Sequence, residues 1–299
     1  MFNRIIAASF QNVIESDEVA LRGCFALESI VVDSANPNYD SRDNCNALIE
    51  KESNTLIRGS LSTTIPSSVA HIGTNAFDAL AGLESITIPE GVKSIGIWAF
   101  SKSGLVEITL PNSLEEIGYL AFIQCTNLAK IVIPDSVKKL GEGAFQHCYN
   151  LTSINAGNGV QVIEGTAFFY CTSLESITIG SNVTQIDANA FFYCNNLANI
   201  NIFAKTPPQL KSDAFQSYEA RLRVPQGCVD LYKSADYWRN FATIVEYNPN
   251  DPDDIGLMPT DPVQPITRFD LNGRPTDSKN GIQILHMSDG SIKKVYVNR

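Results

Sequence analysis

The sequence is poor in the groups on which most enzymes depend. Its 299 residues include only 3 histidines, 3 methionines and 2 tryptophans. The 7 cysteines contain no Cys-x-x-Cys pair and no cysteine–histidine spacing of the kind that binds zinc. Nucleophile elbows, phosphate-binding loops and dinucleotide-binding glycine patterns are also missing. We therefore expect no enzymatic activity, no metal site and no cofactor.

Positive charge and long apolar runs are scarce as well. The 22 lysine and arginine residues are outnumbered by 32 aspartate and glutamate residues, which gives a formal net charge of −10 and a pI of about 4.8. Nucleic acids and anionic lipid surfaces require a basic face, so neither is expected as a partner. No apolar run approaches the ~20 residues needed to cross a bilayer, so no transmembrane segment is expected.

What the chain does have is a repeat of about 23 residues. The dipeptide Ala-Phe recurs at steps of 23, 22, 23, 23, 23 and 24 residues. Such a period, sustained over most of the chain, indicates a repeat solenoid in which each repeat covers only its neighbours. The seven dipeptides are Ala76-Phe77, Ala99-Phe100, Ala121-Phe122, Ala144-Phe145, Ala167-Phe168, Ala190-Phe191 and Ala214-Phe215.

One unit, residues 128–150, shows how the repeat is built. Its Leu-x-x-Ile-x-Ile opening predicts a strand with Ile131 and Ile133 on one face, and Pro134 ends this strand. Phe145 is expected to fill the far side of the coil. A single repeat buries too little apolar surface to fold alone, so the repeats should stack, with their strands in one parallel β-sheet along the solenoid.

The repeat pattern L-x-x-I-x-I-P-x-x-V-x-x-I-G-x-x-A-F-x-x-C resembles the BspA-type (treponemal-like) leucine-rich repeats of bacterial surface proteins, including those of Bacteroidetes. The resemblance covers roughly residues 14–247 and implies a right-handed leucine-rich-repeat coil within a domain of residues 1–247. Residues 33–60 resemble a hairpin-bearing variant of the repeat. Residues 203–247 resemble a C-terminal cap, which would cover the apolar face of the last coil.

Two further segments follow the repeats. Residues 248–265 hold five prolines and four aspartates, a composition typical of an extended linker, and the acidic residues lack the spacing of a calcium-binding loop. Residues 266–299 contain Asn-Gly and Asp-Gly turns between alternating apolar runs, which predicts a small module of three β-strands. Its DLNGR, KNGI and DGS elements resemble the end of the C-terminal sorting domains that Bacteroidetes use for type IX secretion. A plain structural β module is the alternative.

The N-terminus and the resemblance both bear on localisation. The first eight residues hold too short an apolar stretch for a secretory leader. Leu21 and Cys24 already match repeat columns, which suggests that the chain opens inside a repeat and that an N-terminal piece was removed. The resemblance implies an extracellular protein or one on the outer cell surface.

Five of the cysteines occupy one column of the repeat, and Cys45 and Cys228 do not. Coils that lie about 4.8 Å apart bring equivalent Cα atoms within disulfide range. Parallel side chains at equivalent positions nevertheless lack the Cβ geometry of a disulfide, so we expect buried, unpaired thiols that pack as small apolar groups. The column consists of Cys24, Cys125, Cys148, Cys171 and Cys194.

An aromatic row is the first candidate for a binding site. Tyr170 and Tyr193, preceded by Phe169 and Phe192, follow Ala-Phe in consecutive coils and should stack as a ladder, with His147 in the coil before. Amphipathic tyrosine rings suit contacts with proteins and sugars. Packing at the rim of the core is the alternative for the two phenylalanines, and a surface role is favoured over catalysis for His147.

The second candidate is the outward face of the predicted sheet. Its small polar residues have no aromatic anchors and indicate a solvated face. The two columns of this face consist of Ser85, Glu107, Lys130, Ser153, Ser176 and Asn199, and of Thr87, Thr109, Val132, Asn155, Thr178 and Asn201.

The family resemblance implies adhesion to host extracellular matrix proteins, other cells or glycans. Many weak contacts along a rigid repeat surface would add up by geometry. The alternative is a structural spacer that displays another domain and has no ligand of its own. An exposed, contiguous aromatic ladder favours adhesion, whereas a buried one favours the spacer. The identity of the ligand and the oligomeric state are left open by the sequence.

Overall fold

The chain divides into two compact units, Met1–Leu257 and Met258–Arg299. Residues 248–264 of the predicted linker, the turns of the tail module and Cys24 lie outside the described parts of the chain. The computed structural model describes residues 4–7, 29–247, 265–269, 281–287 and 292–297.

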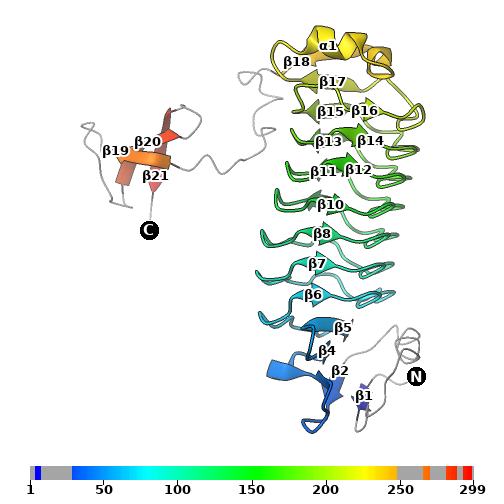
Figure 1. Cartoon of the computed structure of the whole chain (residues 1–299), viewed down its shortest axis with the longest axis vertical. Helices are drawn as coiled ribbons and strands as arrows, with labels where there is room; N and C mark the ends of the chain where they lie inside the picture. Colours follow the sequence, from blue (N-terminus) through cyan, green and yellow to red (C-terminus); the bar gives the residue numbers. More distant parts are fainter. Residues whose placement is uncertain (1–3, 8–28, 248–264, 270–280, 288–291, 298–299) are drawn as a thin grey trace. The chain divides into compact units, whose positions relative to one another are not determined.

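The first unit is a β-solenoid whose coils stack one upon the next (Figure 1). Equivalent residues of successive coils pair in parallel, as Ile154 does with Ile131 and with Ile177. In two earlier coils the same column holds only an isolated bridge between Thr87 and Thr109. The predicted solenoid and its period are therefore confirmed. The six strands of this sheet are β9 (Lys130–Val132), β11 (Ser153–Asn155), β13 (Ser176–Ile179), β15 (Asn199–Ile202), β17 (Arg221–Val224) and β18 (Thr243–Glu246).

A second column of strands runs along another side of the coils, so the prediction of a single sheet was wrong. Each of its strands within the repeats has only two residues, too few for an alternating pattern to stand out in the sequence. They pair in parallel, but β10 and β12 fall in separate sheets. The strands are β6 (His71–Ile72), β7 (Ser94–Ile95), β8 (Glu116–Ile117), β10 (Lys139–Leu140), β12 (Val162–Ile163), β14 (Gln185–Ile186) and β16 (Gln209–Leu210).

The N-terminal end of the solenoid carries an antiparallel hairpin. Strands β4 (Ala47–Glu50) and β5 (Thr55–Gly59) pair antiparallel, and β5 continues in parallel into β6. Four further elements complete this end: β2 pairs in parallel with β1, and β3 pairs antiparallel with β4. They are β1 (Arg4–Ala7), β2 (Ser29–Val32), β3 (Tyr39–Asp40) and the 3₁₀ turn η1 (Arg42–Asn44).

A column of phenylalanines forms the centre of the core. Successive rings stack nearly parallel, with centroids 4.9–5.6 Å apart, and no ring is more than 3% exposed. The Ala-Phe dipeptides thus fill the coil interior as the sequence predicted. The column consists of Phe77, Phe100, Phe122, Phe145, Phe168, Phe191 and Phe215.

The cysteine column lies beside these rings. All six cysteines in the described residues are buried and free, which confirms the prediction of unpaired thiols. Each of the four described thiols of the column approaches the carbonyl oxygen of the phenylalanine in the preceding coil, as Cys171 Sγ does with Phe145 O at 3.2 Å. Burial raises the pKa of Cys125 and of Cys194 to about 12. The thiolate, the reactive form of cysteine, is therefore suppressed.

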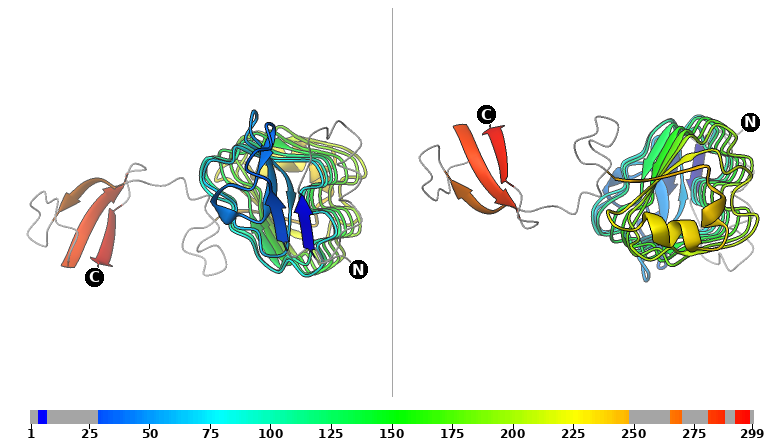
Figure 2. Two further views of the ribbon diagram at one scale, coloured as in Figure 1. Left: turned by 90° about the horizontal axis from the view of Figure 1, so that it is seen from below. Right: turned by 90° about the horizontal axis from the view of Figure 1, so that it is seen from above.

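The C-terminal end of the solenoid is closed by a cap that contains helix α1 (Val229–Ser234) and the 3₁₀ turn η2 (Trp238–Asn240). The helix lies across the end of the stack in Figures 1 and 2. Tyr232 donates its hydroxyl to Ala204 O, and Trp238 donates its indole N–H to Pro208 O, each at 2.7 Å. These two buried side chains tie the cap to the last coil.

The second unit is a three-stranded antiparallel sheet. Its strands are β19 (Pro265–Phe269), β20 (Gly281–Met287) and β21 (Ile292–Val297), with β20 in the middle. The small C-terminal β module expected from the sequence is thus present. The boundaries assigned to the linker and to the sorting-domain resemblance stay predictions.

Two positions in most coils adopt a left-handed backbone. One directly precedes Ala-Phe and the other lies two residues after the phenylalanine, and φ at both is 52–64°. This region is unfavourable for residues other than glycine, most of all for β-branched ones. The first set is Asn75, Trp98, Leu120, Gly143, Thr166 and Asn189, and the second is Ala79, Lys102, Gln124, His147, Tyr170 and Tyr193.

Thr166→Asn is expected to raise the free energy of unfolding by about 1 kcal/mol. Thr166 is β-branched and has a φ of 55°, a region that asparagine tolerates far better. The change is measured by urea denaturation. Ser173→Asn, at a neighbouring position without a positive φ, is the control and should change stability by less than about 0.5 kcal/mol. A Thr166→Asn protein no more stable than wild type would show that no strain is stored at this position.

Candidate binding surface

The structure brings the predicted aromatic residues together in one contiguous, half-buried row. The Tyr170 and Tyr193 rings have centroids 4.2 Å apart, and the Phe169 and Phe192 rings stack at 6.4 Å. His147 extends the row, with its ring 5.2 Å from that of Tyr170. The row is thus neither buried like the core column nor fully exposed. That these residues bind a ligand stays a prediction.

Backbone hydrogen bonds set the spacing of the row. His147 donates its N–H to Phe169 O at 2.8 Å, and Tyr170 donates to Phe192 O at 2.9 Å. Both donors lie at the left-handed position after the phenylalanine. These bonds fix the backbone positions that carry the rings at the spacing of consecutive coils. The row is therefore part of the regular stacking of the fold.

Tyr149 belongs to the row although the sequence analysis did not include it. Its ring lies 5.6 Å from that of His147 and is 39% exposed. Burial lowers the pKa of His147, and its Nδ1 lies 3.2 Å from the Tyr149 hydroxyl, a hydrogen bond whose donor depends on the tautomer of the ring. One signal could have found it: Tyr149 directly follows a column cysteine, where neighbouring repeats have Thr126 and Thr172.

The stacking decides which part of each tyrosine is open to a partner. Tyr170 and Tyr193 are tilted by only 33° at their short separation, so their inner faces cover each other. Phe169 is packed edge-on against both tyrosines, at 5.0 and 5.7 Å. The faces that Tyr170 and Tyr193 turn toward each other are therefore closed to a partner. Such an array offers hydrogen bonds along a line more readily than a flat ring face.

The outward face of the first sheet differs from the solvated surface that the sequence predicted. Val132 is 63% exposed, but Thr178 and Asn201, further along the same column, are only 8% and 2% exposed. The next residue of the column, Arg223, donates to Asn199 Oδ1 at 2.7 Å. A long arginine side chain therefore lies along the sheet at its C-terminal end. The prediction of a solvated face was wrong for this part.

A sequence profile of the BspA type leucine rich repeat region matches the chain in six copies, over residues 59–171 and 94–222. Together these ranges span more than half of the 299 residues. The chain belongs to this family. The predicted resemblance is thereby confirmed for the repeats, and the chain is a BspA-type repeat scaffold. The profile does not include the C-terminal tail.

Solved structures of other repeat proteins resemble this BspA-type chain. The pneumococcal vaccine antigen PcpA is 23% identical, with a TM-score of 0.51 over 75% of this chain and 51% of that one, and it shares the fold. A leucine rich cell surface protein from Faecalibacterium prausnitzii is 31% identical over 67% of this chain and 48% of its own, with a TM-score of 0.47. The chain thus spans about half the length of these proteins. No curated protein matches its sequence.

The BspA-type scaffold shows neither a metal cluster nor a membrane-spanning helix within its described residues. No group of three or more histidine, cysteine, aspartate or glutamate side chains in this part of the chain is placed to hold a metal ion. None of the helices described has the length and apolar character needed to cross a bilayer. The absence of enzymatic activity stays a prediction.

Proposed function

We propose that this chain is a secreted or surface-displayed adhesin that binds proteins or glycans of host or bacterial surfaces through its aromatic row. The observation that carries the proposal is the contiguity of half-buried aromatic rings on consecutive coils, the row formed by His147, Tyr149, Phe169, Tyr170, Phe192 and Tyr193. Tyrosine is among the residues most often found at binding hot spots. A rigid row also loses little conformational entropy when a partner binds.

Protein ligands fit the row better than flat-lying sugars. The inner faces of Tyr170 and Tyr193 are covered by each other, so a sugar ring has little aromatic face on which to stack. A polypeptide needs only hydrogen bonds and edge contacts, which the accessible hydroxyl groups and ring edges supply. Family membership supports the surface location, and the tail supports it further if it serves as a type IX sorting signal.

The Tyr170→Ala/Tyr193→Ala variant is expected to lose at least tenfold in affinity for any ligand of the row. Two adjacent aromatic anchors are removed, and truncation of each typical anchor costs ~2 kcal/mol of binding free energy. The measurement is binding of the purified protein to immobilised matrix proteins and to a glycan array, followed by titration of each hit. Far-UV circular dichroism verifies that the variant is folded.

A matched control is available in the same column of the solenoid. Lys102 and Gln124 occupy the left-handed position that Tyr170 and Tyr193 occupy in later coils, but they have no ring. The Lys102→Ala/Gln124→Ala variant should bind as wild type does. If the tyrosine variant bound as well as this control, the adhesive site would lie elsewhere than in the row. Binding to nothing on either array would favour the structural spacer.

A further inference from the structure

A different surface lies along the edge of the solenoid that precedes each Ala-Phe pair. At this edge a residue of one coil donates its N–H to a carbonyl oxygen of the next coil. Trp98 donates to Tyr119 O, Leu120 to Glu142 O and Thr166 to Ala188 O, at 3.0–3.1 Å. The side chains of this edge are therefore neighbours in space from coil to coil, although they are about 23 residues apart in sequence.

The earlier coils of this edge form an exposed apolar patch. Ile97 and Tyr119 occupy equivalent positions of adjacent coils and are 41% and 42% exposed, and Trp98, which follows Ile97 in the sequence, is half-buried. The Trp98 and Tyr119 rings meet edge to face, with centroids 6.0 Å apart. Large apolar side chains gathered at a surface are typical of contact sites, and tryptophan and tyrosine are the residues most enriched there.

The later coils of the same edge contain a groove, and acidic residues replace the column glycine there. Up to Gly141 the residue after each short strand is glycine, because a Cβ there would lie only 2.5 Å from the Gly118 carbonyl carbon of the preceding coil. The next two coils have Glu164 and Asp187 at this position. Among the described residues no strand pairing joins β10 and β12, at the coil boundary where glycine gives way to glutamate. The strand pairing is interrupted at this boundary, although the Phe145 N–H still donates to Ala167 O of the next coil at 2.8 Å.

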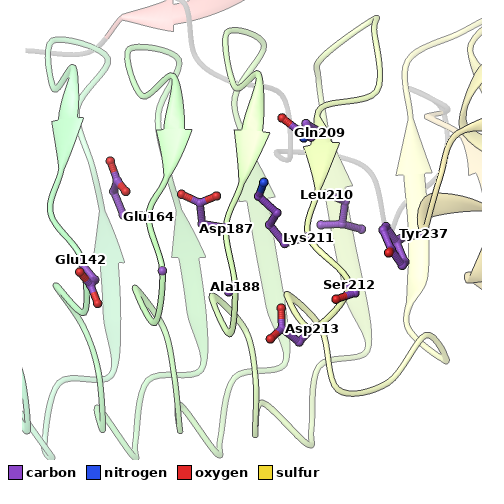
Figure 3. Close-up of a pocket in the computed structure, with 11 residues that line it drawn as sticks. Glu142, Glu164, Asp187, Ala188, Gln209, Leu210, Lys211, Ser212, Asp213 and Tyr237 are labelled. Atoms are coloured by element: carbon purple, nitrogen blue, oxygen red, sulfur yellow. The ribbon is translucent and has the colours of Figure 1, made fainter.

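The groove has a volume of about 610 Å³, and four of the eleven residues that line it are acidic (Figure 3). Glu142, Glu164, Asp187 and Asp213 lie on consecutive coils, and Lys211 is the one cation among the described residues that line it. Burial, followed by the charges of Asp187 and Glu142, raises the pKa of Glu164. Lys139 acts on Glu164 in the opposite direction, and Lys211 follows Asp187 in the same column, so the net negative charge of the groove is only partly compensated.

We propose that this edge is a docking surface for a cationic, helical peptide segment of a partner protein, with an apolar end seated on Ile97, Trp98 and Tyr119. Charge complementarity selects the occupant, since the groove is acidic over successive coils. Coils repeat about every 4.8 Å and helix turns every 5.4 Å. Glu164 and Asp187 occupy one column on consecutive coils, so two lysines or arginines one helical turn apart can each face one of these carboxylates. The surface is separate from the aromatic row.

The probe is a fluorescein-labelled peptide of sequence LLAAKAAAKAAAKAAAK, whose lysines recur every four residues. Its fluorescence anisotropy is measured with the full chain, at low and at physiological ionic strength. The Glu164→Gln/Asp187→Asn variant should bind roughly tenfold more weakly, because two ion pairs are lost. The Ile97→Ala/Tyr119→Ala variant should lose affinity for this peptide but not for one in which alanines replace the leucines.

Glu107→Gln/Glu175→Gln removes the same charge from exposed positions elsewhere on the solenoid and is the matched control. Its affinity for the peptide should equal that of the wild type. If the control variant lost as much affinity for the peptide as the groove variant, the binding would be non-specific charge attraction and the proposal would be overturned. Undiminished binding by the groove variant would overturn it too. So would displacement of the peptide by calcium, which would assign the carboxylates to a cation.

Discussion

Replacing Phe145 with alanine is expected to lower the free energy of unfolding by about 3–5 kcal/mol, the usual cost of deleting a buried aromatic side chain. Phe145 is fully buried and stacks on Phe122 at 5.1 Å and on Phe168 at 5.6 Å. The cavity left by the ring would lie between two coils. In a solenoid each coil is stabilised only by its neighbours. The substitution therefore weakens the packing between the coils before Phe145 and the coils after it.

The two tryptophans report on the two halves separately. Trp98 lies before Phe145 in the stack, and Trp238 lies in the cap after it. In urea denaturation, Trp238→Phe leaves Trp98 as the reporter and Trp98→Phe leaves Trp238, and the midpoint of each of these variants is the reference for the same variant carrying Phe145→Ala. The shift in midpoint caused by Phe145→Ala should differ between the two reporters.

Val132→Ala is the control for this experiment, because its side chain is 63% exposed. It should change stability by less than about 0.5 kcal/mol. If Phe145→Ala cost no more than this control, the phenylalanine column would not be the stabilising centre of the core.

Replacing Trp238 with alanine is expected to detach the cap, at a cost of about 3–5 kcal/mol. The ring is fully buried and packs against Phe215, Tyr232 and Phe241, with centroids 5.3–6.3 Å apart. Its loss would uncover the last phenylalanine of the core column. An exposed apolar end with open strand edges promotes association between molecules. Light scattering should therefore detect oligomers of this variant.

Two further variants separate packing from hydrogen bonding in the cap. Trp238→Phe keeps most of the apolar volume but removes the hydrogen bond to Pro208 O, which should cost about 1–2 kcal/mol without oligomers. Leu231→Ala changes a side chain of helix α1 that is 51% exposed and should have little effect. A monomeric Trp238→Ala protein of wild-type stability would contradict the assigned role of the cap.

The parts of the fold that depend on residues recurring in every repeat could be predicted from the sequence. The Ala-Phe step and the Leu-x-x-Ile-x-Ile opening were enough for the solenoid, its period and its phenylalanine core. The second strand column could not be found in this way, because pairs such as Ser94–Ile95 depend on the backbone of the next coil and leave no alternating pattern. The solvent exposure of a polar column was also misjudged at Asn201, since burial there is decided by side chains of other coils.

The candidate site was predictable only in part. Tyr170 and Tyr193 were placed together by the period alone, and the structure brings them together. Tyr149 was missed because it lies in a different column and joins the row through His147. The acidic groove was missed as well. Its signal is the replacement of a column glycine by Glu164, which has meaning only once the close approach of consecutive coils is known.

Because consecutive coils pair in register, the number of coils in the solenoid can change without a change in how any two coils pack. Each coil pairs with the coil after it in the same register as with the coil before it. Ile154, for example, pairs with Ile131 on one side and with Ile177 on the other. A coil can therefore be duplicated or lost in evolution without redesign of the coils on either side. Such a change would alter the reach of the molecule by about 4.8 Å while the cap and the hairpin end keep their own contacts. Gene duplication can thus lengthen the scaffold in uniform steps.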